Sequence, residues 1–260
     1  TQTMEFVWKS SPSIGRKSDI FTGVLPNVYW PPKGFCFDIN CFDEEIDELN
    51  ADYRAREFIS LVKNQATKYL TNNTIITMGM DFFYRDAGKW FRNLDRLMAA
   101  VNRLERESGV YMFYSTPSCY LKSLHQAHQV WPIKLDDFFP YADAANAYWT
   151  GYYTSRPSLK YQIKYGNALL QAAKQLAVLS QNGKEESKQL RPLQETLGIL
   201  QHHDAVTGTC KQFVANDYSR MLHQSLKEAQ GSIISSLYKI WAPVVNEVEP
   251  LHFCDQLNIS

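Results

Sequence analysis

The sequence predicts an α/β layer with parallel strands, followed by a three-helix bundle and then by the start of a β domain. Patterns typical of helices and strands alternate over residues 43–141, and three long amphipathic patterns with no strand between them follow. Near the end of the chain the apolar spacing becomes extended again. We therefore expect three domains, at residues 1–142, 143–240 and 241–260.

The first domain is predicted to alternate between helix and strand. Apolar residues at helical spacing predict amphipathic helices over residues 43–70 and 90–104. The runs 74–80 and 110–115 are apolar on both faces and rich in β-branched or aromatic residues, as buried parallel strands are. This order predicts parallel strands joined by right-handed helical crossovers.

The second domain is predicted to contain only helices. Apolar residues recur at helical spacing over residues 158–180, and the polar stretch 181–186 is expected to form a loop. Pro192 suits the first turn of a second helix, and residues 213–240 predict a third. A glycine-bearing break at residues 207–209 separates the last two helices, so the pattern is that of a three-helix bundle.

The composition excludes several classes of protein and partner. The 260 residues are 45% hydrophobic and 21% charged, which supports a sizeable core and is unlike disordered, collagenous or coiled-coil chains. Basic and acidic side chains number 27 each, so there is no net charge with which to bind nucleic acid or an anionic membrane surface. No apolar run reaches the roughly 18 to 20 residues of a membrane span. We expect neither nucleic acid nor a membrane span.

The two ends of the sequence indicate a segment of a longer protein. Residue 1 is threonine rather than an initiator methionine, and the first residues lack the charged and apolar parts of a signal peptide. Residues 258–260 stop in the middle of a pattern. We therefore expect an internal fragment.

Cysteines and glycosylation signals favour a secretory or endosomal history. Cys36 and Cys41 lie five positions apart in a Gly/Pro-rich aromatic stretch, a spacing that favours a small local disulfide over a zinc knuckle. Asn72 and Asn258 begin N-x-S/T acceptor sequons, which chance alone could also supply. A competing interpretation, a cytosolic α/β protein with a helical interaction domain, requires Cys36 and Cys41 to be free thiols.

Asp81 is the first candidate functional residue. It comes directly after the predicted strand 74–80, where Gly79 allows a close approach of the backbone. Functional side chains of parallel α/β sheets gather where strands end at their carboxyl edge. An aspartate that caps a helix or stabilises a turn is the alternative interpretation.

The second candidate is the stretch from Gln201 to Thr209, which contains His202, His203 and Asp204 at the end of a predicted helix. Neighbouring helical residues point about 100° apart, so at most one of the two histidines is expected to face a given metal ion. Zinc takes three or four ligands, and no HExxH, paired CxxC or 2-His-1-carboxylate spacing supplies them nearby. Further ligands would come from distant sequence or from another chain.

Six motifs, in order along the chain, resemble those of one enzyme family. They are FTGVLPN at residues 21–27, TMGMDF at 77–82, YSTP at 114–117, DFFPYAD at 137–143, YWTGYYTSRP at 148–157 and QHHDAVTGT at 201–209. Together they are similar to the class II α-mannosidases of glycoside hydrolase family 38, of the lysosomal type, and the last motif is the most specific. The resemblance implies that residues 1–142 are the C-terminal part of an α/β catalytic domain, and that the helical bundle carries HHDAVTGT.

The resemblance also implies roles for individual residues in a zinc-dependent retaining α-mannosidase. It implies that His203 binds one Zn²⁺ ion, that Asp204 accepts hydrogen bonds from mannose hydroxyls, and that Asp81 is the general acid/base. Trp149 would line the sugar pocket, and His202 would be structural. The remaining zinc ligands and the nucleophilic aspartate would lie outside this chain, so the fragment alone is expected to be inactive.

One shared pocket is expected from the same resemblance. Asp81 and His203 should lie about 6 to 10 Å apart, by the carboxylate spacing of glycosidases, with His203 turned inward, His202 turned away and Trp149 forming a wall. Met80 departs from the family, which usually has a polar residue there, so no sugar contact is expected from it.

The implied substrates are terminal α-mannosyl residues of N-linked glycans and oligosaccharides, in lysosomal or secreted glycoprotein catabolism. Other segments or chains of the same mannosidase would be the protein partners. The alternative is a non-catalytic carbohydrate-binding or structural subunit, because the nucleophile is missing.

Overall fold

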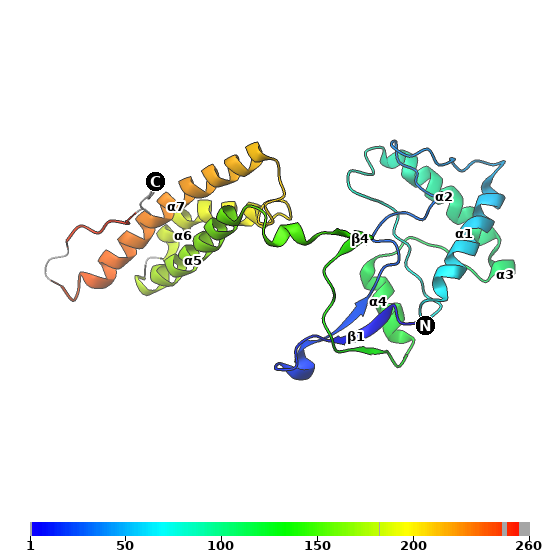
Figure 1. The fold of residues 1–260 in the computed structure, drawn as a ribbon, viewed down its shortest axis with the longest axis horizontal. Helices are drawn as coiled ribbons and strands as arrows, with labels where there is room; N and C mark the ends of the chain where they lie inside the picture. Colours follow the sequence, from blue (N-terminus) through cyan, green and yellow to red (C-terminus); the bar gives the residue numbers. More distant parts are fainter. Residues whose placement is uncertain (1, 182, 246–248, 255–260) are drawn as a thin grey trace. The chain divides into compact units, whose positions relative to one another are not determined.

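The computed structural model describes residues 2–181, 183–245 and 249–254. The chain divides into two compact units, Thr1–Phe138 and Phe139–Ser260 (Figure 1). About half of the chain is helical and strands are few.

A small mixed sheet opens the first unit. Strand β1 (Glu5–Lys9) pairs antiparallel with β2 (Asp19–Gly23), and the 3-10 helix η1 (Gly15–Ser18) lies in the connection between them. Strand β3 (Ile133–Lys134) pairs parallel with the other side of β1, which gives the order β2-β1-β3. No pattern in the sequence predicted these strands.

Four helices complete the first unit: α1 (Ala51–Ala66), α2 (Ala87–Arg103), α3 (Glu105–Ser108) and α4 (Pro117–Gln126). Helix α4 has a proline in its first turn, as the geometry of helix starts favours. The predicted helix 43–70 was too long at its start. Just before α1, Oδ1 of Asp47 accepts hydrogen bonds from the backbone N–H groups of Leu49 and Asn50. These bonds stabilise a turn in place of a helix.

The core of the first unit lies between α1, α2 and the loop that contains the disulfide. Cys36 and Cys41 form the predicted bond, with their Cα atoms 5.8 Å apart. Next to them, the Trp90 ring is completely buried. The largest fully buried side chains of this core are Phe37, Ile46, Phe58, Trp90 and Leu97.

The predicted strands 74–80 and 110–115 were wrong as strands. Both segments lie outside regular secondary structure. A strand exists only where a neighbouring strand completes its hydrogen bonds, and neither segment has such a neighbour among the described residues.

Side chains bond the backbone of these two segments instead. Gln65 donates through Nε2 to the carbonyl oxygen of Ile75, 3.1 Å away. The side-chain amide of Asn102 bonds both backbone groups of Met112, accepting from its N–H at 2.8 Å and donating to its carbonyl oxygen at 2.9 Å. One asparagine therefore replaces a strand neighbour at a single position.

The second unit begins with a short hairpin. Strands β4 (Ala142–Ala144) and β5 (Ala147–Tyr148) pair antiparallel, and Asn146 takes the left-handed conformation that such turns need, with φ 60°. A 3-10 helix, η2 (Thr150–Tyr153), leads on to the long helices.

Three long helices, α5 (Pro157–Leu179), α6 (Gly183–Leu200) and α7 (Gln212–Trp241), pack pairwise around one apolar core (Figure 1). Gly166 of α5 permits a close approach, because a Cβ atom there would lie 3.1 Å from the Cδ1 atom of Leu222. The core consists mainly of Leu159, Ile163, Leu170, Leu190, Leu193, Leu197, Leu200, Leu222, Ala229 and Ile233.

Two predictions for the second unit and the end of the chain need correction. The predicted loop 181–186 and a helix start at Pro192 were wrong, since α6 begins at Gly183 and contains Pro192. Leucines on both sides of the proline pack into the core, and this burial outweighs the lost hydrogen bond. In the region predicted to begin a β domain, residues 242–245 and 249–254 form no strand, and the rest lies outside the described residues.

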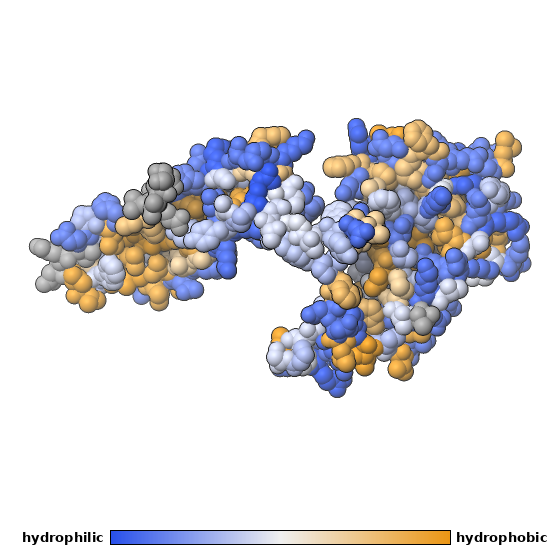
Figure 2. Space-filling model, viewed as in Figure 1, coloured by the Kyte–Doolittle hydropathy of each residue, from blue (hydrophilic) through white to orange (hydrophobic). Residues whose placement is uncertain are grey.

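Figure 2 shows apolar residues on the surface of each unit. Large exposed side chains include Phe82 (86%), Phe113 (64%) and Phe139 (93%). No helix in the described part of the chain is long and apolar enough to cross a membrane.

Candidate functional site

The candidate metal-binding residues lie in the loop that connects α6 to α7. The loop begins after Leu200, and its residues 201–207 form successive turns. Ala205 is fully buried in the bundle core, and Val206 packs against that core. The residues just before Ala205 are exposed, so the loop is anchored on one side and presents polar side chains on the other.

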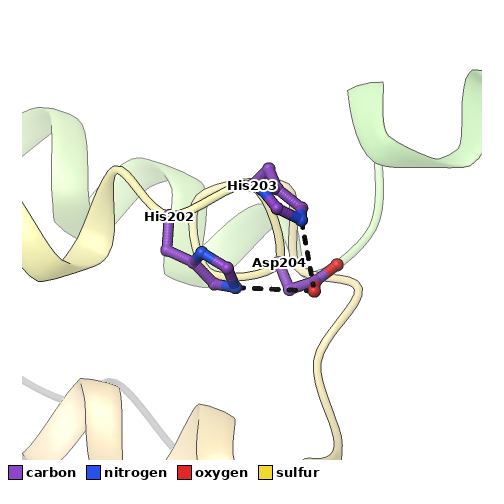
Figure 3. A group of neighbouring side chains, drawn as sticks. All are labelled: His202, His203 and Asp204. Atoms are coloured by element: carbon purple, nitrogen blue, oxygen red, sulfur yellow. Dashed lines mark ion pairs between the residues drawn. The ribbon is translucent and has the colours of Figure 1, made fainter. Parts of the chain in front are cut away.

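His202, His203 and Asp204 form a compact group of exposed side chains (Figure 3). The Nε2 atom of His202 lies 3.5 Å from Oδ2 of Asp204, and the Nε2 atom of His203 lies 3.9 Å from the same oxygen. His202 thus lies beside His203 and Asp204, and its expected orientation away from a pocket shared with Asp81 stays a prediction, because Asp81 belongs to the other unit. Both histidines lie beyond the end of α6, so the 100° separation of helical neighbours does not apply to them.

Two threonines orient this group. Thr209 donates through Oγ1 to Oδ1 of Asp204 at 2.9 Å, which leaves Oδ2 on the side of the histidines. The hydroxyl of Thr207 lies 2.9 Å from that of Thr209 and donates to the carbonyl oxygen of His203. The N–H of Cys210 donates to the carbonyl oxygen of Asp204, 3.1 Å away. The carboxylate is thus held by its own loop.

The donor set fits a zinc ion. It offers two imidazole nitrogens and a carboxylate oxygen, which are ligands that Zn²⁺ takes in proteins, and the three ligand atoms all lie within 4.8 Å of one another. Ligands about 2.0 to 2.2 Å from one zinc ion lie at most about 4.4 Å apart, and the distances of 3.5 and 3.9 Å from the two histidine nitrogens to Oδ2 of Asp204 are within this limit.

Gly208 allows the loop to approach the residues just before α5. Its φ is +73°, and a Cβ atom at this position would lie 2.3 Å from the carbonyl oxygen of Ser155. Only glycine combines this conformation with such a close approach. The loop therefore lies directly on the start of α5.

Asp81 lies in a turn of the first unit rather than at the end of a strand. The N–H of Phe83 donates to the carbonyl oxygen of Met80 at 3.1 Å, which closes the turn around Asp81. Phe82, inside the turn, has a φ of 64°. The strand-edge argument for Asp81 was therefore wrong, and residue 81 is exposed.

A tyrosine holds one oxygen of that carboxylate. The hydroxyl of Tyr29 donates to Oδ1 of Asp81 at 2.8 Å across 52 positions of sequence. This contact orients the carboxylate and leaves its second oxygen, Oδ2, without a bond to Tyr29. No motif in the sequence singled out Tyr29, because a hydroxyl that bonds a distant turn leaves no spacing pattern.

Trp149 stands between β5 and η2 with 58% of its surface exposed. The backbone N–H of Trp149 donates to the carbonyl oxygen of Tyr141 at 2.9 Å, and the two rings meet edge to face with centroids 5.4 Å apart. An exposed indole face fixed in this way is able to stack on the apolar face of a sugar.

The other candidate residues have the following positions. Asn72 is exposed, as a glycan acceptor must be, and Asn258 lies outside the described residues. Asp81 belongs to the first unit and His203 to the second, so their convergence on one pocket stays a prediction.

Each unit matches a domain of sugar-cleaving enzymes. The N-terminal domain of glycosyl hydrolases family 38 matches residues 1–144, and the alpha mannosidase middle domain matches residues 147–240. The chain therefore belongs to glycosyl hydrolases family 38, which confirms the resemblance stated from its motifs.

Named relatives agree along the whole chain. A lysosomal alpha-mannosidase of Bos taurus is 42% identical, over 100% of this chain and 27% of the bovine protein. A probable alpha-mannosidase of Arabidopsis thaliana is 40% identical over 100% of this chain and 26% of the plant protein, and a lysosomal alpha-mannosidase of Dictyostelium discoideum is 42% identical over 84% and 23%. The chain thus spans about a quarter of the length of these relatives.

Proposed function

We propose that this chain is the part of a zinc-dependent retaining α-mannosidase that supplies one metal-binding loop and the general acid/base. The observation that carries the proposal is the group formed by His202, His203 and Asp204, whose donor atoms lie within 4.8 Å of one another. The family membership supports it, since the relatives are named as alpha-mannosidases. The substrates would be terminal α-mannosyl residues of N-linked glycans.

Of the three grouped side chains, only His203 is a zinc ligand in this proposal: Asp204 is assigned to the sugar and His202 to the structure of the loop, so the remaining zinc ligands come from outside the chain. Zinc, when bound, supplies a Lewis acid and a template that holds two sugar hydroxyls. Asp204 accepts a hydrogen bond from a mannose hydroxyl through its exposed carboxylate, which Thr209 orients. Trp149 stacks on the apolar face of the sugar.

Asp81 transfers the proton in both halves of the reaction. A retaining glycosidase needs a nucleophilic carboxylate and, about 5 Å away, a carboxyl group that protonates the leaving oxygen and then takes a proton from water. Because Tyr29 donates to Oδ1, the oxygen that carries the proton is Oδ2. The nucleophile lies outside this chain.

Substitutions in the complete protein test these roles. We expect His203→Ala to lose zinc and mannosidase activity together, whereas Asp81→Asn keeps zinc and loses turnover. Zinc content is measured by atomic absorption and activity with an aryl α-mannoside. His223→Ala on the exposed face of α7 and Asp52→Asn at a surface ion pair are the matched controls. A His203→Ala protein with normal zinc and turnover would refute the proposal.

The same assays separate the alternative function. A non-catalytic carbohydrate-binding or structural subunit would retain mannosides without cleaving them, and Asp81→Asn would then change nothing. Compartment is tested separately: the disulfide and the exposed Asn72 support a lysosomal or secreted protein, so glycosidase treatment of cell-derived material should reduce its mass.

A further inference from the structure

Two cations at the start of α5 point into the loop that carries His203. Lys160 donates through Nζ to the carbonyl oxygens of Ser155 (2.7 Å), Val206 (2.9 Å) and Thr207. Arg156 donates through Nη1 to the carbonyl oxygen of Gly208. Three consecutive carbonyls of the HHDAVTGT motif are therefore held by residues about 50 positions earlier in the chain.

These contacts occupy every hydrogen-bond donor of the Lys160 side chain. An ammonium group has three donors, and all three have a carbonyl partner here. Across residues 2–181, 183–245 and 249–254, neither Lys160 nor Arg156 forms an ion pair with a carboxylate. Their charges serve the backbone of the loop rather than an acidic neighbour.

Hydrogen bonds and one close contact between hydroxyls connect Lys160 to the candidate site. The carbonyl oxygen of Thr207 accepts from Lys160, and the Thr207 hydroxyl donates to the carbonyl oxygen of His203 and lies 2.9 Å from the hydroxyl of Thr209. Thr209 in turn donates to the carboxylate of Asp204. Movement of residues 206–208 would therefore move both His203 and Asp204.

We infer that Lys160 and Arg156 are positioning residues of the metal- and sugar-binding loop: they fix the backbone of residues 206–208 and thereby the direction of His203 and Asp204. This inference rests on the proposed function of the loop. Residues that orient metal ligands commonly change metal affinity by about 10- to 100-fold when removed.

Replacement of Lys160 by methionine tests the inference. Methionine keeps much of the length of lysine but has no donors, so the three carbonyls lose their partner. Lys164→Met is the matched control, because Lys164 is exposed one turn further along the same helix. Lys160→Arg keeps the charge, but a planar guanidinium cannot reach the same three carbonyl oxygens from the position of one Nζ atom. We therefore expect it to restore the loop only partly.

Three measurements are made. In the 260-residue chain, hydrogen exchange of the amides of Ala205, Gly208 and Cys210 should become about tenfold faster in Lys160→Met and stay unchanged in Lys164→Met. In the complete protein, competition with a chelator should show Zn²⁺ held about 10- to 100-fold more weakly. The kcat for an aryl α-mannoside should fall more than KM changes.

Thr209→Val extends the test without disturbing Lys160. It removes only the hydroxyl that orients Asp204, at an exposed position. We expect slow exchange in residues 205–208, as in the unsubstituted protein, together with reduced turnover.

The possible failures are distinguishable. If Lys160→Met retains normal loop exchange, normal Zn²⁺ affinity and normal kcat while His203→Ala loses zinc, the inference is wrong and the proposed function stands. If the exchange of all three bundle helices rises together, Lys160 has only a structural role and the inference is overturned. If His203→Ala retains zinc, the proposed function itself fails.

Discussion

The indole nitrogen of Trp90 donates a 2.9 Å hydrogen bond to the carboxylate of Asp38, and both side chains are buried in the core of the first unit. The same oxygen accepts from the N–H of Tyr84 at 3.0 Å. Tyr84 also stacks on the Trp90 ring, with centroids 4.7 Å apart. A buried carboxylate thus joins the disulfide loop, the segment after Asp81 and helix α2.

Asp38→Asn should destabilise the first unit by about 2 to 3 kcal/mol, because an amide has one acceptor oxygen and leaves a buried donor unpaired. Burial favours the neutral acid, but the bonds from Trp90 and from backbone N–H groups outweigh it and lower the pKa of Asp38. The stability from this charge is therefore present above about pH 4 and is lost as pH falls through the lowered pKa. Hydrogen exchange of α2 amides, with Asp52→Asn as control, measures the change; equal exchange in both variants would contradict it.

Glu5 should make the first unit more stable in acid. Its side chain is 2% exposed, Tyr120 donates to Oε1, and Oε2 has no partner among the described residues. Burial raises the pKa of Glu5, opposed by the hydrogen bond from Tyr120. Its stabilising contribution is complete below the ordinary value near 4.3 and is lost as pH rises through the raised pKa.

Glu5→Gln should therefore flatten the dependence of the unfolding midpoint on pH above about pH 4, and raise the midpoint at neutral pH. The exposed residue Glu48 provides the control, as Glu48→Gln should leave the profile unchanged. Parallel profiles for Glu5→Gln and the unsubstituted chain would show that folding does not raise the pKa of Glu5.

The double substitution Cys36→Ser, Cys41→Ser should cost about 2 kcal/mol, since the disulfide closes a loop of about six residues and restricts the unfolded chain. Urea unfolding followed by exchange of α1 and α2 amides measures this loss. Cys119→Ser, at an exposed free thiol, is the control. If dithiothreitol leaves the urea midpoint of the unsubstituted chain unchanged, the disulfide does not stabilise it.

A pair of glycines in the second unit should respond in opposite directions. Gly208→Ala should destabilise by about 1 to 3 kcal/mol and displace the loop, because its φ is +73° and its Cβ would meet the Ser155 carbonyl. Gly198→Ala, inside α6 with open space around it, should stabilise by about 0.5 to 1 kcal/mol. Thermal unfolding measures both. A Gly208→Ala chain as stable as Gly198→Ala would contradict the close approach.

The sequence predicted the long helices well because the helical spacing of apolar residues lies within each helix itself. The predicted ranges 158–180 and 213–240 lie within a few residues of α5 and α7. The segments 74–80 and 110–115 were wrongly predicted as strands. Their apolar, β-branched and aromatic residues indicate burial and a preference for extended backbone, whereas a strand also needs a partner strand that is distant in the sequence. Pro192 was misplaced because packing outweighed its local preference.

The candidate site could be predicted only in part. The motif named His203 and Asp204, but the side-by-side arrangement of His202 and His203 depends on where α6 ends. Arg156 and Lys160 bond backbone carbonyls, which every residue type possesses, so their targets have no sequence signature. Tyr29 escaped notice for a related reason, since its partner Asp81 is 52 positions away.

Two segments of the first unit should allow copies of the isolated chain to associate. Within the described residues, the peptide groups of 74–79 and 110–115 have no strand beside them, and the side chains of Tyr111 and Phe113 are exposed. The backbone groups that Gln65, Tyr84 and Asn102 do not bond lie close in sequence to exposed aromatic rings, and such edges are what identical chains need to pair with one another. The purified chain should therefore lose monomer with increasing concentration, through intermolecular β-pairing that begins in these two segments.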